Sequence, residues 1–101
     1  MNTIIIISKE FKDDYTTRKA GEKLRQIIIA SPGPVTLDFK DLKIASSSFF
    51  DEGLAKLSEN EWDTKKFHEK IKILNLFKMD YFLLKDACQM RGLKIQNDLG
   101  D

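Results

Sequence analysis

The sequence holds one cysteine and one histidine among its 101 residues, and this scarcity excludes several kinds of chemistry. The lone thiol, Cys88, cannot form an internal disulfide and is typical of a reducing compartment, so we expect a cytoplasmic protein in which Cys88 is a small core residue. The lone histidine, His68, lies in a charged segment without a nearby cysteine. It does not supply the ligand set of a zinc site, so no metal is expected.

An excess of charge of one sign is also missing, because 17 basic residues nearly balance 16 acidic ones and leave a net charge of +1. This balance gives no electrostatic basis for binding nucleic acid or an anionic membrane surface. The longest apolar run, residues 4–7 (IIII), is far shorter than the roughly 20 residues of a membrane-spanning helix. The run also lacks the flanks of a signal peptide, so neither a membrane segment nor a leader is expected.

The glycine motifs that bind phosphates are absent, since neither GxxxxGK nor GxGxxG occurs. No serine lies in a GxSxG turn, and no spare histidine is placed to activate one. The acidic residues are scattered along the chain rather than paired, which is typical of a solvated surface. These absences predict a protein that is not an enzyme and that needs no cofactor.

What the chain does contain is an alternation of strand and helix patterns. Residues 3–8 are β-branched and apolar on both faces, which predicts a strand covered on both sides. Residues 35–40 alternate apolar and polar, residues 71–76 hold a third strand around Ile71 and Ile73, and residues 93–96 suggest a fourth. Strands that alternate with helices predict a mainly parallel sheet in one compact unit.

The helix boundaries are marked by capping and breaking residues. Thr16 or Thr17 is expected to cap the first helix. This helix is expected to end at residues 31–34 (SPGP), because proline cannot continue it. A second helix follows the serines, and residues 59–69 predict its extension and a loop. Asp80 is expected to cap the last helix and Gly92 to stop it.

Three consecutive serines between the second strand and the second helix are the most informative feature. The carboxyl end of a strand, beside a helix start, is where open α/β sheets place ligand and modification sites. Ser48, with Asp51 three residues on, is the best candidate for the cap and would contribute about 1 kcal/mol. Ser46 and Ser47 are then not needed by the helix, although all three serines can also be read as capping residues alone. A phosphate on Ser47 would meet the helix dipole but also the like charges of Asp51 and Glu52.

The run of residues 37–50 resembles the STAS domain of sulfate transporter tails and anti-sigma factor antagonists. The antagonist pattern is an L-D-L strand followed by D-S-S-G-L or D-S-T-G-L, and residues 37–39 (LDF) are similar to that strand. The resemblance places Ser47 at the phosphorylated serine of the pattern. It places Ser46 at the motif aspartate and Phe49 at the motif glycine, so a bulky ring would stand where a partner kinase approaches.

A closer resemblance is to the bacterial STAS-like domain family, whose D-F-x-G-V-x-x-I-S-x-S-F-x-D-E pattern is similar to residues 38–52 and whose early T-R pair is similar to Thr17-Arg18. It implies an α/β STAS-like sandwich with a mostly parallel sheet of four to five strands and about three helices, in a single domain of residues 1–101. Members often accompany ATPases of the histidine-kinase type. The resemblance therefore implies a regulatory protein-interaction module that switches partners with such an ATPase.

The resemblance implies a partner-binding surface at the start of the second helix, together with Arg18 at the start of the first helix. Ser47 is the first candidate phosphoacceptor and Ser48 the second. The partner-binding candidates are Arg18, Ser46, Ser47, Ser48, Phe49, Asp51 and Glu52.

Two other functions remain open at this point. In the first, the serines only cap the helix, and Phe49 or Trp62 is an apolar anchor for a constant partner or for a homodimer. In the second, the helix start is an anion site for a nucleotide or another small ligand, with Lys40 and Lys43 as the nearest basic residues. Arg18 can serve any of these functions, or it can form an ordinary surface salt bridge.

Overall fold

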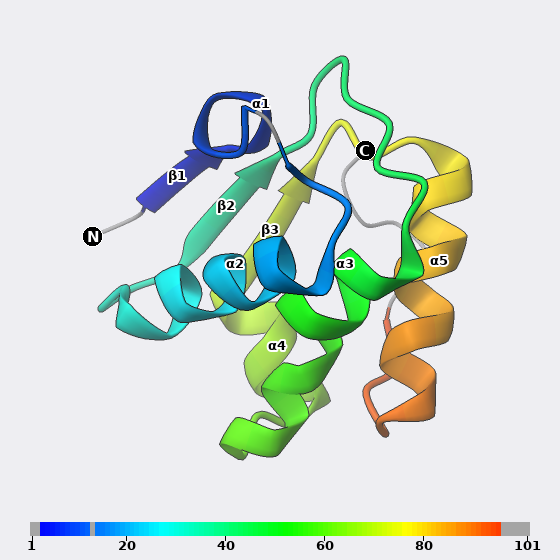
Figure 1. The fold of residues 1–101 in the computed structure, drawn as a ribbon. Coiled ribbons are helices and arrows are strands. Elements are labelled where there is room, and N and C mark those ends of the chain that lie inside the picture. The colour runs from blue at the N-terminus through cyan, green and yellow to red at the C-terminus, as the bar shows by residue number, and fades with distance from the viewer. Residues whose placement is uncertain (1–2, 13, 96–101) are drawn as a thin grey trace.

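Three short parallel strands form the sheet in the computed structural model, which describes residues 3–12 and 14–95. The strands are β1 (Thr3–Ile6), β2 (Val35–Asp38) and β3 (Ile71–Leu74), with β2 in the middle (Figure 1). Ile5, Leu37 and Ile73 lie in register across the sheet, and all three are buried. The alternation of apolar and polar residues thus places one side of each strand in the core.

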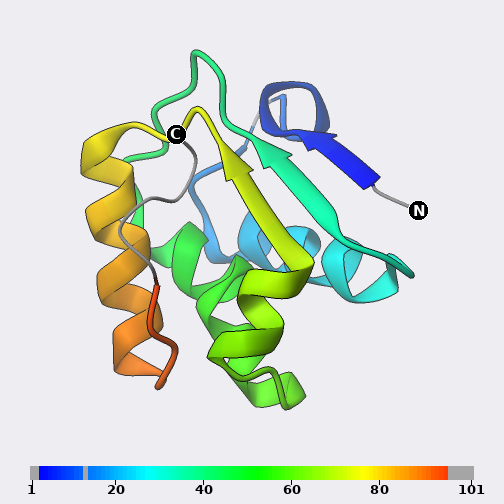
Figure 2. The ribbon, with the colours of Figure 1, turned by 180° about the vertical axis from the view of Figure 1, so that it is seen from behind.

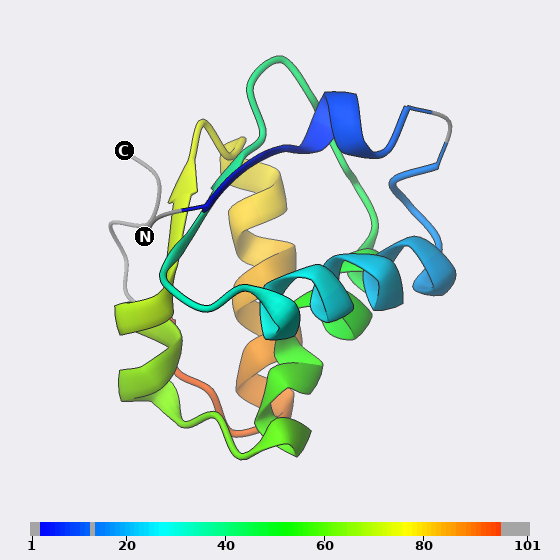
Figure 3. The ribbon, with the colours of Figure 1, turned by 90° about the vertical axis from the view of Figure 1, so that its left-hand side faces the viewer.

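Helices fill the connections between the strands and lie mainly on one face of the sheet. Figure 2 shows β2 and β3 in front with α2 and α3 behind them, and Figure 3 shows the same arrangement from the β1 side. The helices are α1 (Ile7–Glu10), α2 (Arg18–Ala30), α3 (Ser47–Gly53), the 3-10 helix η1 (Ala55–Asn60), α4 (Thr64–Lys70) and α5 (Lys78–Met90).

A close contact between α2 and α3 organises the core. A Cβ added to Gly21 of α2 would lie 2.7 Å from the carbonyl oxygen of Phe49, and Gly53 of α3 packs against Leu24 in the same contact. Phe49 and Phe50 are fully buried beneath this contact. The absence of a side chain at Gly21 is therefore what lets the two helices approach.

The α/β class and the parallel sheet are confirmed, but the expected number of elements is wrong. The described residues hold three strands rather than four to five, and five α-helices rather than about three. Residues 93–95 are not a strand, because Lys94 bonds to α4 instead: its N–H donates to Thr64 Oγ1 at 3.1 Å and its carbonyl lies 3.0 Å from His68 Nε2. Gln96, the end of that predicted strand, lies outside the described residues.

The first strand also differs from its prediction. It ends at Ile6 rather than at Ser8, because α1 begins at Ile7. The expectation of cover on both faces is wrong as well, since Ile4 is 67% exposed and lies in register with Thr36 and Lys72 on the outer face. The reason is that α2 and α3 occupy the same face of the sheet, so the described residues do not cover the other.

The start of α2 and the end of α5 follow the expected capping chemistry. Thr17 caps α2 by accepting a hydrogen bond from Ala20 N, and Gly92 follows α5 with a φ of 84°. The segment of residues 59–69 contains a separate helix, α4, capped by Asp63, in place of the predicted extension and loop.

Cys88 is fully buried in α5, as expected of a core residue, and burial raises the pKa of its thiol to about 12.

Candidate functional site

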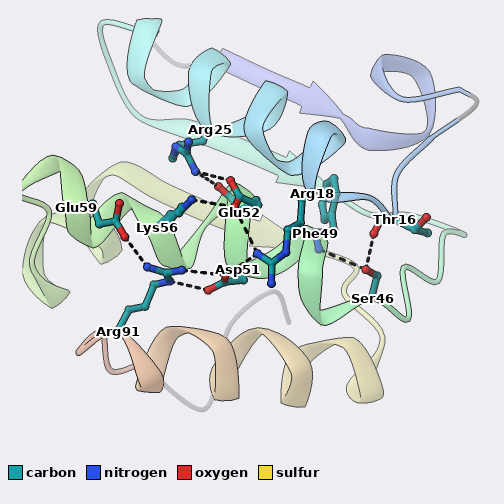
Figure 4. A network of polar contacts seen from close by, with 10 residues as sticks. All are labelled: Thr16, Arg18, Arg25, Ser46, Phe49, Asp51, Glu52, Lys56, Glu59 and Arg91. Carbon is teal, nitrogen blue, oxygen red and sulfur yellow. Dashed lines mark hydrogen bonds and ion pairs between the residues drawn. The ribbon is translucent and has the colours of Figure 1, made fainter.

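Ser46, not Ser48, is the cap of α3. Its Oγ accepts a hydrogen bond from Phe49 N at 3.3 Å and donates one to the carbonyl of Thr16 (Figure 4). The helix starts two residues earlier than predicted, because Ala45 takes a left-handed conformation with a φ of 53° and Ser46 is extended. Ser46 therefore joins the start of α3 to the segment before α2, and the prediction that the helix does not need it is wrong.

The loop before Ser46 is held by a buried carboxylate on α5. Asp80 is fully buried, and its two oxygens accept hydrogen bonds from the amides of Ile44 at 2.6 Å and Ala45 at 2.8 Å. Asp80 was expected to cap α5, but it lies within the first turn, after a cap residue, Phe77, that makes no side-chain bond. Its carboxylate fixes the conformation that leads into the serines, since two backbone amides would otherwise lose their acceptors.

Phe49 does not lie on the surface. Its side chain is fully buried, and its ring packs edge-on against those of Phe11 and Phe50, each with a centroid distance of 5.8 Å. The expectation that Phe49 meets a partner, as an obstacle or as an apolar anchor, is therefore wrong. A residue with this position in the core stabilises α3 instead.

Asp51 is the centre of an ion-pair network that joins three helices (Figure 4). Arg91, which follows α5, donates from Nε to Asp51 Oδ1 at 2.6 Å and from Nη2 to Oδ2 at 3.0 Å. Arg18 of α2 donates to Asp51 Oδ2 at 2.9 Å, and Glu59 accepts from Arg91 at 2.6 Å. The hydrogen bonds from Arg91, and then those from Arg18, lower the pKa of Asp51 to about 2, against the effect of desolvation.

Glu52 forms a second centre of ion pairs, deeper in the same contact. It is 9% exposed, and its carboxylate accepts from Lys56 Nζ at 2.9 Å, from Arg25 at 3.2 Å and from Arg18 at 3.3 Å. Arg25 also donates to the backbone carbonyl of Glu52. Lys56 first and Arg25 next hold the pKa of Glu52 below its usual value. Glu52 thus stabilises the packing of α2 on α3, and little of it is available to a partner.

Ser47 lies at a groove between α2, α3 and α5 with a volume of about 490 Å³. Ser47 is exposed, whereas Ser48 is half-buried and does not line the groove. The groove combines an apolar floor on α5 with charged side chains from all three helices. Its lining residues are Arg18, Ser47, Asp51, Leu83, Asp86, Ala87, Met90 and Arg91.

The structure thus brings together part of the predicted surface and separates the rest. Arg18, Ser47 and Asp51 meet at the groove, while Lys40 and Lys43 do not line it. The ammonium of Lys43 lies 5.7 Å from the centre of the Phe77 ring. Within residues 3–12 and 14–95, the histidine, cysteine and acidic side chains form no cluster of three that could hold a metal ion.

Sequence reasoning missed most polar residues that the site takes from outside the serine segment. Arg25, Lys56, Glu59, Asp86 and Arg91 went unnoticed, and Asp80 was given another role. The spacing of Glu52 and Lys56, four residues apart, was a usable signal because such residues meet on a helix surface. The other contacts cross between elements, and no local pattern indicates them.

A one-sided parallel sheet, a serine-capped helix after its central strand and a groove at that helix define a small α/β module of the STAS-like class. Residues 20–81, more than half of the chain, match the model of the family described as "STAS-like domain of unknown function (DUF4325)". The chain belongs to this family. No match was found among curated proteins or among solved structures. In the described part of the chain, every helix is too short or too polar to cross a bilayer.

Proposed function

We propose that this protein is a non-enzymatic, cytoplasmic regulatory module that binds a protein partner at the groove and releases it when Ser47 is phosphorylated. The observation that carries the proposal is that the two neighbouring serines, Ser46 and Ser47, differ in their hydrogen bonds and exposure. Ser46 is committed to capping α3, while Ser47 is exposed at the edge of the groove. Ser47 is therefore a hydroxyl that can be modified without removing a structural hydrogen bond.

The lining of the groove suits a protein partner. Leu83, Ala87 and Met90 offer apolar surface on α5, with Met90 89% exposed. The guanidinium groups of Arg18 and Arg91 border this surface. Apolar anchors surrounded by arginines are frequent at protein interfaces.

The proposed partner is an ATPase of the histidine-kinase type, because the resemblance to the STAS-like family implies such a partner. Ser47 Oγ would attack the γ-phosphorus of a nucleoside triphosphate held by that partner, forming the O–P bond as the bond to the β-phosphate oxygen breaks. The hydroxyl proton passes to a base of the kinase, and the nucleoside diphosphate leaves. The product carries about −1.5 to −2 charges at Ser47, beside Asp51 and Asp86, so an interface that forms on the groove with an unmodified Ser47 is weakened.

Calorimetric titration with such an ATPase from the same cell tests this proposal. Ser47→Ala should bind like the wild type, and Ser47→Asp should bind at least about tenfold more weakly, which corresponds to about 1.4 kcal/mol. Ser48→Asp is the matched control, since Ser48 does not line the groove, and it should retain binding. Equal affinity of Ser47→Ala and Ser47→Asp would refute the switch.

The exposed face of α5 supports a second candidate, a constitutive interface or a homodimer without phosphorylation. Met79 is 62% exposed, Phe82 46% and Met90 89%, at helical spacings that place them on one side of α5. Sedimentation equilibrium over a range of concentrations tests the homodimer. A monomer at all concentrations that still binds the ATPase favours the first proposal.

A further inference from the structure

Ser47 and Asp51 stand one turn apart on the same face of α3, and both line the groove. Side chains four residues apart on a helix have Cβ atoms separated by roughly 5–6 Å. The Nη1 atom of Arg18 lies 2.9 Å from Asp51 Oδ2, and Arg18 lines the same groove as Ser47 (Figure 4). A phosphate on Ser47 would therefore lie within reach of the Arg18 guanidinium.

The two arginines of the groove differ in the donors that they have left. Arg91 uses Nε, Nη1 and Nη2 on Asp51 and Glu59. Arg18 bonds to the described residues through Nη1 alone, and its side chain is 58% exposed. The Nε and Nη2 groups of Arg18 are thus the guanidinium donors available for a new anion at this end of the groove.

The charges that face Ser47 come from all three helices. Arg18 of α2 and Arg91 after α5 are positive, while Asp51 of α3 and Asp86 of α5 are negative. A phosphate adds about −1.5 to −2 charges to this balanced set. It attracts Arg18 more strongly than one carboxylate does, because its negative charge is larger and the guanidinium can bind it through two donors. Asp51 keeps its two hydrogen bonds from Arg91.

We infer that Arg18 is the receptor for a phosphate on Ser47, turning its Nε and Nη2 donors onto the phosphoserine while Arg91 retains Asp51. This inference rests on the proposed function, because it gives the consequence of modifying Ser47. Phosphorylation then repositions a side chain that borders the groove, in addition to adding charge. Arg18, the first residue of α2, thus contacts the phosphate directly from the α2 side of the groove.

The test uses the protein with phosphoserine installed by genetic encoding, and follows the second pKa of the phosphate by ³¹P NMR titration. Phosphoserine has a second pKa near 6. With phosphoserine at position 47, the substitution Arg18→Gln should raise this pKa by roughly one-half to one, since a nearby cation favours the dianion. Arg18→Lys, which keeps the charge but loses the fork, should give an intermediate value.

Phosphoserine at position 48 is the matched control, because Ser48 does not line the groove, and its pKa should not respond to Arg18→Gln. Phosphoserine at position 47 should also titrate lower than phosphoserine at position 48 in the otherwise unchanged protein, a comparison that needs no substitution of Arg18. If phosphoserine at position 47 has the same pKa with Arg18 present and in the Arg18→Gln variant, the inference is overturned.

This outcome is independent of the proposed function. The phosphate is installed without the kinase, so an Arg18-dependent pKa with unchanged ATPase affinity would support the inference and refute the switch. Loss of ATPase affinity in Ser47→Asp, together with a phosphoserine pKa that does not depend on Arg18, would support the switch and refute the inference.

Discussion

Arg91 holds Asp51 with two hydrogen bonds, of 2.6 Å and 3.0 Å, across forty residues of sequence. The pair joins the end of α5 to α3, and both residues line the groove that Ser47 also lines. Since the side chain of Asp51 is only 18% exposed, solvent screens this pair less than an ordinary surface salt bridge.

The lowered pKa of Asp51 makes stability depend on pH in the acid range. The pKa is about 2 in the folded protein against an ordinary value of 3.8, so the folded state favours the ionised form. The stabilisation is complete above about pH 4 and is lost as the pH falls through about 2; it amounts to about 1–2 kcal/mol after allowance for screening. Urea unfolding between pH 5 and pH 2 should show a steeper loss in the wild type than in Asp51→Asn. Glu59→Gln, at the exposed end of the network, should leave the slope nearly unchanged, and equal slopes for the wild type and Asp51→Asn would contradict this role.

Asp80 should be among the most costly residues to replace. Asp80→Ala leaves the amides of Ile44 and Ala45 without their acceptors, so we expect a loss of about 2–4 kcal/mol in the free energy of unfolding. Asp80→Asn keeps one acceptor oxygen and should lose about half as much. Asp86→Ala, on the exposed side of the same helix, is the control and should change stability by less than about 0.5 kcal/mol. Similar losses for Asp80→Ala and Asp86→Ala would show that the two hydrogen bonds contribute little.

Gly21→Ala should separate α2 from α3. The added Cβ would lie 2.7 Å from the backbone carbonyl of Phe49, which cannot move without displacing α3, so the expected cost is about 2–4 kcal/mol. Gly92→Ala is a control with a different cause, since nothing lies within 4 Å but the φ of 84° strains an alanine by about 1 kcal/mol. Thermal unfolding compares the two variants. A Gly21→Ala protein as stable as Gly92→Ala would mean that the helices can shift apart at little cost.

The thiol of Cys88 should be unreactive in the folded protein. Burial raises its pKa to about 12, so almost no thiolate is present at mildly alkaline pH. The side chain is also fully buried, so a thiol reagent cannot reach the sulfur in the folded protein. Reaction with a chromogenic disulfide reagent should therefore proceed at the rate of unfolding and accelerate in urea. Ser47→Cys provides an exposed thiol at the groove and should react within seconds. Rapid labelling of Cys88 in the absence of denaturant would show that α5 opens locally.

The serine segment shows how far local patterns lead. The alternation of residues 35–40 and the three serines after it correctly predicted a strand, which ends at Asp38, and a nearby helix start, because these patterns depend on neighbours in sequence. The choice of capping serine was wrong, because Ser46 is favoured by a carbonyl thirty residues away, at Thr16, and by the loop that Asp80 holds. A choice among three adjacent hydroxyls depends on contacts that the local sequence does not contain.

The α/β class, the parallel strands, the caps at Thr17 and after α5, and the family all follow from the order of the amino acids, because periodicity, capping and motif spacing are local properties. Which side chains form the site depends instead on how the helices pack in three dimensions. That packing buries Phe49, pairs Asp51 with Arg91 and Arg18, and leaves Ser47 exposed at the groove. The physical reason is that burial and ion pairing arise where helices distant in sequence come together, and the small residue Gly21 permits that approach.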